Sequence, residues 1–185
     1  MKYQPKVGDV LNFSWSGFFG FMIKLRSYIQ YGGIFNQEKR EKNRWTHTAI
    51  VGEVQGDIVY VYEAISKGFT KNKYSVNELN TYLQNKNMKV GRTKIPLKDV
   101  KKYCEKYKGR PYGFHQIAII GYAVFGNTVL KNFSTAKFLI CSEAVARILY
   151  DASDKKINFE KEFNKRYDYI KPIDLSYSKY LNWEK

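Results

Sequence analysis

The clearest hydrophobic pattern begins with a short apolar run at residues 138–140 and continues as a helical periodicity. Apolar side chains recur over residues 144–149 at the spacing of one helix face, which therefore packs inward. Cys141 precedes that face by three residues, and this predicts a position at the helix N-terminus. The helix dipole favours a thiolate there by only ~0.3–1 kcal/mol when exposed and up to ~2 kcal/mol when partly buried. A reactive thiolate therefore also needs a cationic partner, and without one Cys141 is a buried structural cysteine.

A second pattern predicts a β-hairpin. Residues 45–54 and 58–64 are rich in β-branched and apolar side chains, and residues 55–57 form a turn between them. With a three-residue loop, His47 and Glu63 become diagonal neighbours on one face, about 7–8 Å apart by backbone. A two-residue loop places them on opposite faces, because a shift of one residue inverts every side chain. We expect the three-residue loop.

The remaining pattern predicts short elements of both kinds. Strands are expected at 7–13 and 88–92, and helices at 16–28, 76–84 and 97–107. Loops are expected at 35–43 and 126–136, a basic loop or ragged strand at 66–77, a buried helix or apolar surface at 117–125, and a tail from 171. The chain contains no internal repeat and no linker, so the sequence predicts one α+β domain over residues 1–185.

The distribution of positive charge suggests what kind of partner the protein could bind. The formal net charge is +15, and residues 67–110 alone hold 13 basic and 3 acidic side chains. Such a segment is either a solvated lysine-rich face or a surface that attracts phosphate, anionic lipid or an acidic polymer. No zinc-finger spacing or recognition-helix pattern accompanies it, so a nucleic-acid partner is not expected, whereas peripheral contact with an anionic membrane remains open.

Several classes are not favoured by composition. Two cysteines do not make a disulfide framework, and two cysteines with two histidines lack the spacing of a zinc site, so no metal and no cofactor are expected. No secretion signal opens the chain, and the apolar run at 117–125 is far shorter than the ~20 residues of a membrane span. We therefore expect a soluble, cytoplasmic protein.

Three residues together suggest thiol chemistry. His47 is expected to take the proton of Cys141, and Glu63 to orient and stabilise the imidazolium. The thiolate then attacks a carbonyl, and the Cys141 backbone N–H at the helix start is a candidate oxyanion donor. A pair of Cys104 with His115 is the alternative, but Cys104 falls inside the helix at 97–107 and is expected to be a core residue.

The order of these motifs resembles the permuted papain-like group of the NlpC/P60 superfamily, the YiiX/YaeF-like proteins. The resemblance rests on residues 8–11, 46–51, 61–64 and 140–145, with the proline-containing segment 171–175 after them. His47 precedes Cys141 here, whereas ordinary papain-like enzymes have the cysteine first. That inverted order is what circular permutation produces.

The resemblance implies a circularly permuted papain-like fold, with a small antiparallel sheet or half-barrel packed against helices that include the Cys141 helix. It implies a cysteine hydrolase that cleaves a peptide, isopeptide or N-acyl amide bond, with Cys141 as nucleophile, His47 as base and Glu63 as third residue. We expect Tyr112, Trp45 and Ser142 to contact the substrate. Two alternatives remain: a lipid acyltransferase or acyl hydrolase with the same triad, and a non-catalytic basic module that binds nucleic acid or an anionic membrane.

Overall fold

The computed structural model describes residues 2–15, 43–113 and 139–184, together with residues 24, 28, 36, 37 and 39. The predictions for the helix at 16–28 and the segments 117–125 and 126–136 lie outside the described residues, as does most of the loop predicted at 35–43. His115 also lies outside them. All structural statements below concern the described part of the chain.

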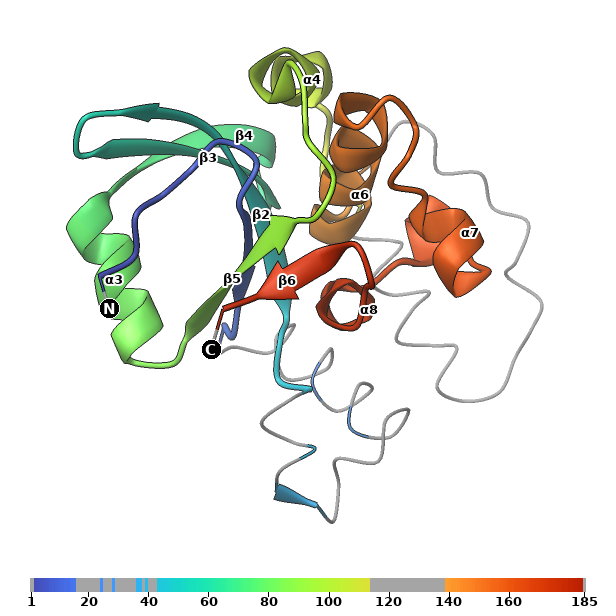
Figure 1. Cartoon of the computed structure of the whole chain (residues 1–185), viewed down its shortest axis with the longest axis horizontal. Coiled ribbons are helices and arrows are strands. Elements are labelled where there is room, and N and C mark those ends of the chain that lie inside the picture. Colours follow the sequence, from blue (N-terminus) through green and yellow to red (C-terminus); the bar gives the residue numbers. More distant parts are fainter. Residues whose placement is uncertain are drawn as a thin grey trace.

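The centre of the fold is a six-stranded antiparallel sheet (Figure 1). Its strands in spatial order are β4 (Gly68–Ser75), β3 (Ile58–Ile65), β2 (His47–Gln55), β1 (Val10–Phe13), β5 (Met88–Thr93) and β6 (Leu181–Trp183). The short strand β1 is hydrogen-bonded to β2 on one side and to β5 on the other, so it joins the two halves of the sheet. An α+β architecture with helices against an antiparallel sheet is therefore confirmed.

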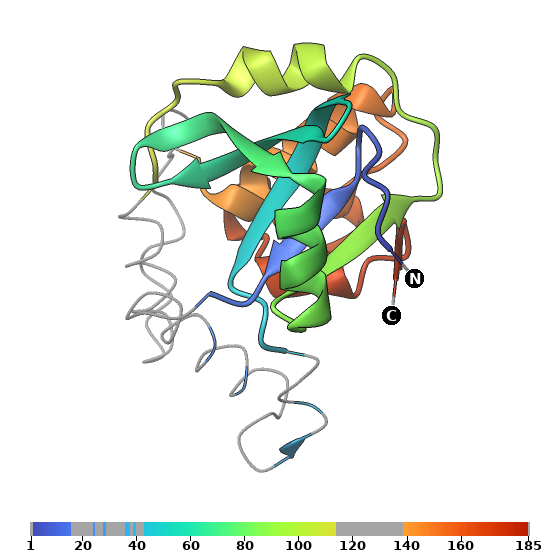
Figure 2. The same ribbon diagram turned by 90° about the vertical axis from the view of Figure 1, so that its left-hand side faces the viewer.

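Helices cover both faces of the sheet (Figures 1 and 2). They are α3 (Val76–Gln84), α4 (Val100–Tyr107), α6 (Cys141–Ala152), α7 (Phe159–Phe163), the 3₁₀ helix η3 (Tyr167–Tyr169) and α8 (Pro172–Ser176). Helix α6 packs against β2, β3 and α4, and its apolar face forms one core with the sheet. A second core lies on the opposite face, where α3 contributes Leu79. None of the described helices has the length and apolar character needed to cross a bilayer.

The predicted helix bounds agree best with the structure where the sequence contains a capping motif or a clear apolar spacing. Helix α3 has the predicted bounds, because the Ser75 side chain caps the backbone N–H of Glu78 and the Glu78 side chain caps that of Ser75. Helix α6 begins at Cys141, as the apolar spacing predicts. Helix α4 begins at Val100, three residues later than Leu97, after Asp99 in a left-handed conformation.

The hairpin of β2 and β3 turns more tightly than predicted. Gln55 opposes Ile58, so the loop has two residues and not three, and the prediction of a three-residue loop is wrong. Gly56 has a φ of +57°, a conformation that tight two-residue hairpin loops use and that glycine adopts without a steric penalty. With a regular ladder, this loop would place His47 and Glu63 on opposite faces.

A β-bulge at Gly52 restores the register that the site needs. The pairing of β2 with β3 shifts by one residue there, and beyond the bulge Ala49 opposes Glu63. His47 lies two residues before Ala49, so it shares the face of Glu63. A Cβ on Gly52 would lie 2.3 Å from the Tyr62 ring, so the bulge brings the backbone against an aromatic side chain where only glycine fits.

Two segments are more ordered than the sequence suggests. Residues 66–77, predicted as a basic loop or ragged strand, contain the regular edge strand β4 and the first turn of α3. The tail from 171 forms α8, which Asp174 caps by accepting from the Lys171 backbone N–H at 2.9 Å, and then the strand β6. Both follow from partners elsewhere in the chain, since β4 pairs with β3 and β6 with β5.

Candidate active site

His47 and Glu63 form a buried pair on one face of the sheet. Strand β2 carries His47 and strand β3 carries Glu63, and the side chains are 4% and 1% exposed. Glu63 Oε2 lies 2.7 Å from His47 Nε2, the distance of a charge-assisted hydrogen bond. The bulge at Gly52 is the local reason that these two residues, both near the open end of the hairpin, share one face of the sheet.

Cys141 completes the group from the first turn of α6. Its thiol and the His47 ring are hydrogen-bond partners. Because Nε2 of His47 already faces Glu63, Nδ1 is the ring nitrogen left for the sulfur. The backbone N–H groups of Thr48 and Ser142 also hydrogen-bond to the sulfur. The three residues expected to form a triad are thus adjacent in the order Cys141, His47, Glu63.

The electrostatics of the three groups favour a thiolate–imidazolium pair. Burial opposes the charge on Cys141, but the charge and hydrogen bond of His47 and the two backbone N–H groups lower the pKa of its thiol. Burial likewise opposes the charged form of His47, but Cys141 and Glu63 raise its pKa to about 9. Burial of Glu63 is outweighed by hydrogen bonds from His47 and two further side chains, which lower the pKa of its carboxyl group.

Trp15 covers the imidazole from one side, and this contact is not evident in the sequence. The indole ring of Trp15 stacks on the His47 ring with centroids 4.0 Å apart and an interplanar angle of 14°. Phe13 lies at 6.0 Å from the same ring in a tilted arrangement. Trp15 is 38% exposed, so it separates the His47–Glu63 pair from solvent on that side while remaining at the surface. Register explains the contact, because Phe13 of β1 pairs with His47.

Asn72 and Tyr74 of β4 bind the other oxygen of the carboxylate. Asn72 Nδ2 donates to Glu63 Oε1 at 2.8 Å, and Tyr74 Oη donates to the same atom at 2.9 Å. Neither contact is evident in the sequence, where the lysines of residues 66–77 indicate a basic loop or ragged strand. The available signal was the alternation of Thr70, Asn72 and Tyr74, a row of uncharged polar side chains on one face of a strand.

The three residues expected to contact substrate have different environments. Burial and the charge of the Cys141 sulfur raise the pKa of the Tyr112 phenol. Ser142 is fully buried and its Oγ donates to the Ile170 carbonyl at 2.6 Å, so its hydroxyl holds the start of α6 in place. Trp45 is buried, with Lys89 Nζ 4.8 Å from its ring centroid. Substrate contact by these residues stays a prediction.

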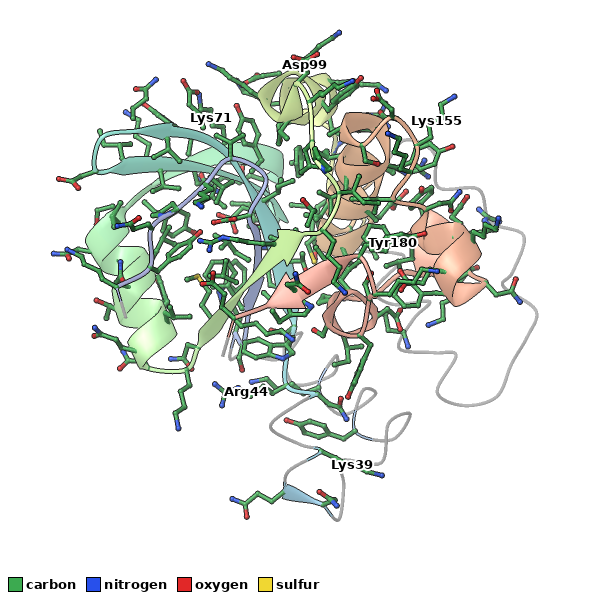
Figure 3. The ribbon with its side chains drawn as sticks, in the orientation of Figure 1. Lys39, Arg44, Lys71, Asp99, Lys155 and Tyr180 are labelled. Atoms are coloured by element: carbon green, nitrogen blue, oxygen red, sulfur yellow. The ribbon has the colours of Figure 1, made fainter. Side chains whose placement is uncertain are left out.

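Several lysines of the basic segment form ion pairs within the fold. Glu53 on β2 pairs with Lys71 at 2.8 Å and with Lys101 at 2.9 Å, and Asp151 of α6 pairs with Lys106 at 2.8 Å. Lys71 lies beside the β3–β4 ribbon (Figure 3) and alternates along β4 with Thr70 and Asn72, so it is on the opposite face of the strand from Asn72. Within residues 2–15, 43–113 and 139–184, no three His, Cys, Asp or Glu side chains converge as a metal site.

No protein-family model and no curated protein matches the chain. The resemblance to permuted papain-like proteins therefore stays a prediction from the sequence motifs. The case for a function rests on the contacts among Cys141, His47 and Glu63.

Proposed function

We propose that this chain is a cysteine-dependent hydrolase with a permuted papain-like arrangement, which cleaves an amide bond through an acyl-thioester on Cys141. The observation that carries the proposal is the chain of contacts from the Cys141 sulfur to the His47 ring and on to the Glu63 carboxylate. A thiol at a helix start, a base in contact with it and an anionic group behind the base are the parts of a nucleophile–base–orienter triad.

The first half-reaction follows from the ion pair. The Cys141 thiolate attacks the carbonyl carbon of the substrate, a C–S bond forms and the carbonyl oxygen takes the negative charge. The C–N bond then breaks as His47 gives its Nδ1 proton to the departing nitrogen, which leaves as an amine. Glu63 stabilises the imidazolium before this transfer and keeps the ring in place after it.

The second half-reaction reverses the roles. A water molecule gives a proton to the neutral His47 and attacks the thioester carbonyl. A C–O bond forms, the C–S bond breaks, and the acid product leaves the Cys141 thiolate beside the imidazolium again. The backbone N–H of Cys141, in the first turn of α6, belongs to the helix N–H groups that have no partner inside a helix, and we assign it to the oxyanion.

The test is the reactivity of the two cysteines in the folded protein. We expect iodoacetamide to alkylate Cys141 with an apparent pKa well below the ~8.5 of a free thiol, because the imidazolium stabilises the thiolate. Peptide mass spectrometry assigns the alkylated residue. We also expect p-nitrophenyl acetate to leave one acetyl group on Cys141, with release of p-nitrophenol.

The controls are Cys104 in the same sample and the Cys141→Ala variant, which should release no p-nitrophenol above background. An apparent pKa near ~8.5 at Cys141, or acetylation that is unchanged in Cys141→Ala, would contradict the proposal.

A further inference from the structure

The edge strand β4 presents a polar row to the carboxylate of Glu63. Thr70, Asn72 and Tyr74 alternate along β4, so they share one face of the strand. Asn72 and Tyr74 both donate to Glu63 Oε1, and the Thr70 hydroxyl lies 3.2 Å from Asn72 Nδ2 as its acceptor. None of the three touches Cys141 or His47 among the contacts that the structure gives.

The two carboxylate oxygens of Glu63 have separate partners. Oε1 accepts from Asn72 and Tyr74, while Oε2 faces His47 Nε2 at 2.7 Å. Glu63 is only 1% exposed, and a buried carboxylate without donors would tend to take up a proton. The donors on Oε1 hold Glu63 ionised and fix its plane, so that Oε2 stays directed at the ring.

We propose that Asn72 and Tyr74 are positioning residues for the thiolate–imidazolium pair and act on Cys141 through Glu63 and His47. This inference rests on the proposed function, since it assigns how the triad is tuned. It makes β4 part of the machinery of the site, although β4 lies at the edge of the sheet.

The experiment measures the apparent pKa of Cys141 by iodoacetamide alkylation in Tyr74→Phe and Asn72→Ala. We expect each substitution to raise that pKa by about 0.5 to 1 unit. With one donor removed, Glu63 is less fully ionised and less firmly directed at His47, so it stabilises the imidazolium less, and the imidazolium in turn stabilises the thiolate less. The matched control is Tyr60→Phe on the adjacent strand, whose hydroxyl meets Gln55 and not Glu63. It should leave the pKa of Cys141 unchanged.

Comparing Glu63→Gln with and without Tyr74→Phe separates an effect on the orientation of Glu63 from an effect on the stability of the fold. In a Glu63→Gln background, Tyr74→Phe should produce no further shift in the pKa of Cys141, because the group through which Tyr74 acts is gone. A role confined to hairpin stability predicts a lower melting temperature with an unchanged pKa.

The measured pKa of Cys141 distinguishes failure of this inference from failure of the hydrolase proposal. A low pKa in the unmodified protein that rises in Tyr74→Phe and Asn72→Ala, but not in the Glu63→Gln background, supports the inference. A low pKa that neither substitution moves overturns the inference and leaves the hydrolase proposal standing. An ordinary pKa in the unmodified protein contradicts the hydrolase proposal, and the inference is rejected with it.

Discussion

The two cysteines of the chain are both buried, yet their surroundings give them opposite chemistry. Cys104 is 0% exposed on α4, and burial together with the charge of Glu105 raises the pKa of its thiol. Cys141 is 5% exposed at the start of α6, and its thiol pKa is lowered. Burial opposes the thiolate at both positions, so exposure does not distinguish them.

The difference lies in what each sulfur meets. Near Cys104 the backbone of β2 approaches at Gly52, where a Cβ would lie 3.4 Å from the sulfur. Near Cys141 the same strand offers a backbone N–H from Thr48 and the ring of His47. The same strand therefore meets Cys104 with the backbone of its bulge and meets Cys141 with two hydrogen-bond donors near its start. A reactive thiol is thus indicated by its partners, not by its accessibility.

The largest expected effect separates the two cysteines directly. Cys141→Ala should lower amide or ester turnover by on the order of 10³-fold or more, because no other described group replaces the nucleophile. Cys104→Ala should leave turnover within about 2-fold and lower the free energy of unfolding by about 1–2 kcal/mol through lost packing. Steady-state kinetics and urea unfolding measure the two effects. Equal losses of activity in both variants would remove the distinction.

The next effect concerns the partner of His47. Glu63→Gln should lower turnover by about 10²-fold, because an amide stabilises the imidazolium far less than a carboxylate does. Glu53→Gln is the matched control: Glu53 lies on β2, pairs with Lys71 and Lys101, and has no contact with His47. Unchanged kinetics in Glu63→Gln would show that the carboxylate is dispensable.

A smaller and reversible effect is expected from pH. The ion pair exists above the lowered pKa of Cys141 and below the pKa of His47, which is raised to about 9. The rate kcat/KM should therefore rise through an acid limb below the ~8.5 of an ordinary thiol and fall through an alkaline limb near pH 9, as His47 loses the proton needed by the leaving group. Cys104 should be alkylated only after unfolding. A single ionisation near that of a free thiol would contradict the ion pair.

The smallest effect on chemistry is expected at the bulge. In Gly52→Ala the new methyl group would lie 2.3 Å from the Tyr62 ring and near Cys104, so the free energy of unfolding should fall by about 1–3 kcal/mol. The apparent pKa of Cys141 should change little as long as the one-residue shift between Val51 and Glu53 is kept, because that shift is what places His47 on the face of Glu63. Urea unfolding and alkylation of the same sample check both statements. Unchanged stability would mean that Tyr62 moves aside without cost.

Local signals in the sequence predicted much of the site. The spacing of apolar residues after Cys141 placed it at the head of α6, and β-branched strands around a glycine turn indicated the hairpin. The face shared by His47 and Glu63 was predicted correctly, but from a wrong loop length. Two deviations, a shorter loop and a bulge at Gly52, cancel in the register at the site. Pairing patterns of this kind depend on the contact between Gly52 and Tyr62, which the sequence does not show.

Long-range partners account for what the sequence did not reveal. Trp15 stacks on His47 because β1 pairs with β2, and the alternation on β4 is obscured by the lysines of its outer face. Asn72 and Tyr74 can be recognised as partners of Glu63 only when β4 is known to pair with β3, the strand that carries Glu63. Side chains that support a site from neighbouring strands thus lack the local spacing that identifies a helix or a turn.

The order of the elements along the chain has a consequence for synthesis on the ribosome. His47, Glu63 and the strands β1 to β5 all emerge before Cys141, and only β6 of the sheet follows it. A nascent polypeptide therefore acquires the base and its carboxylate first and the sulfur late. Until translation passes the start of α6, His47 and Glu63 lack the Cys141 sulfur that we propose as the nucleophile.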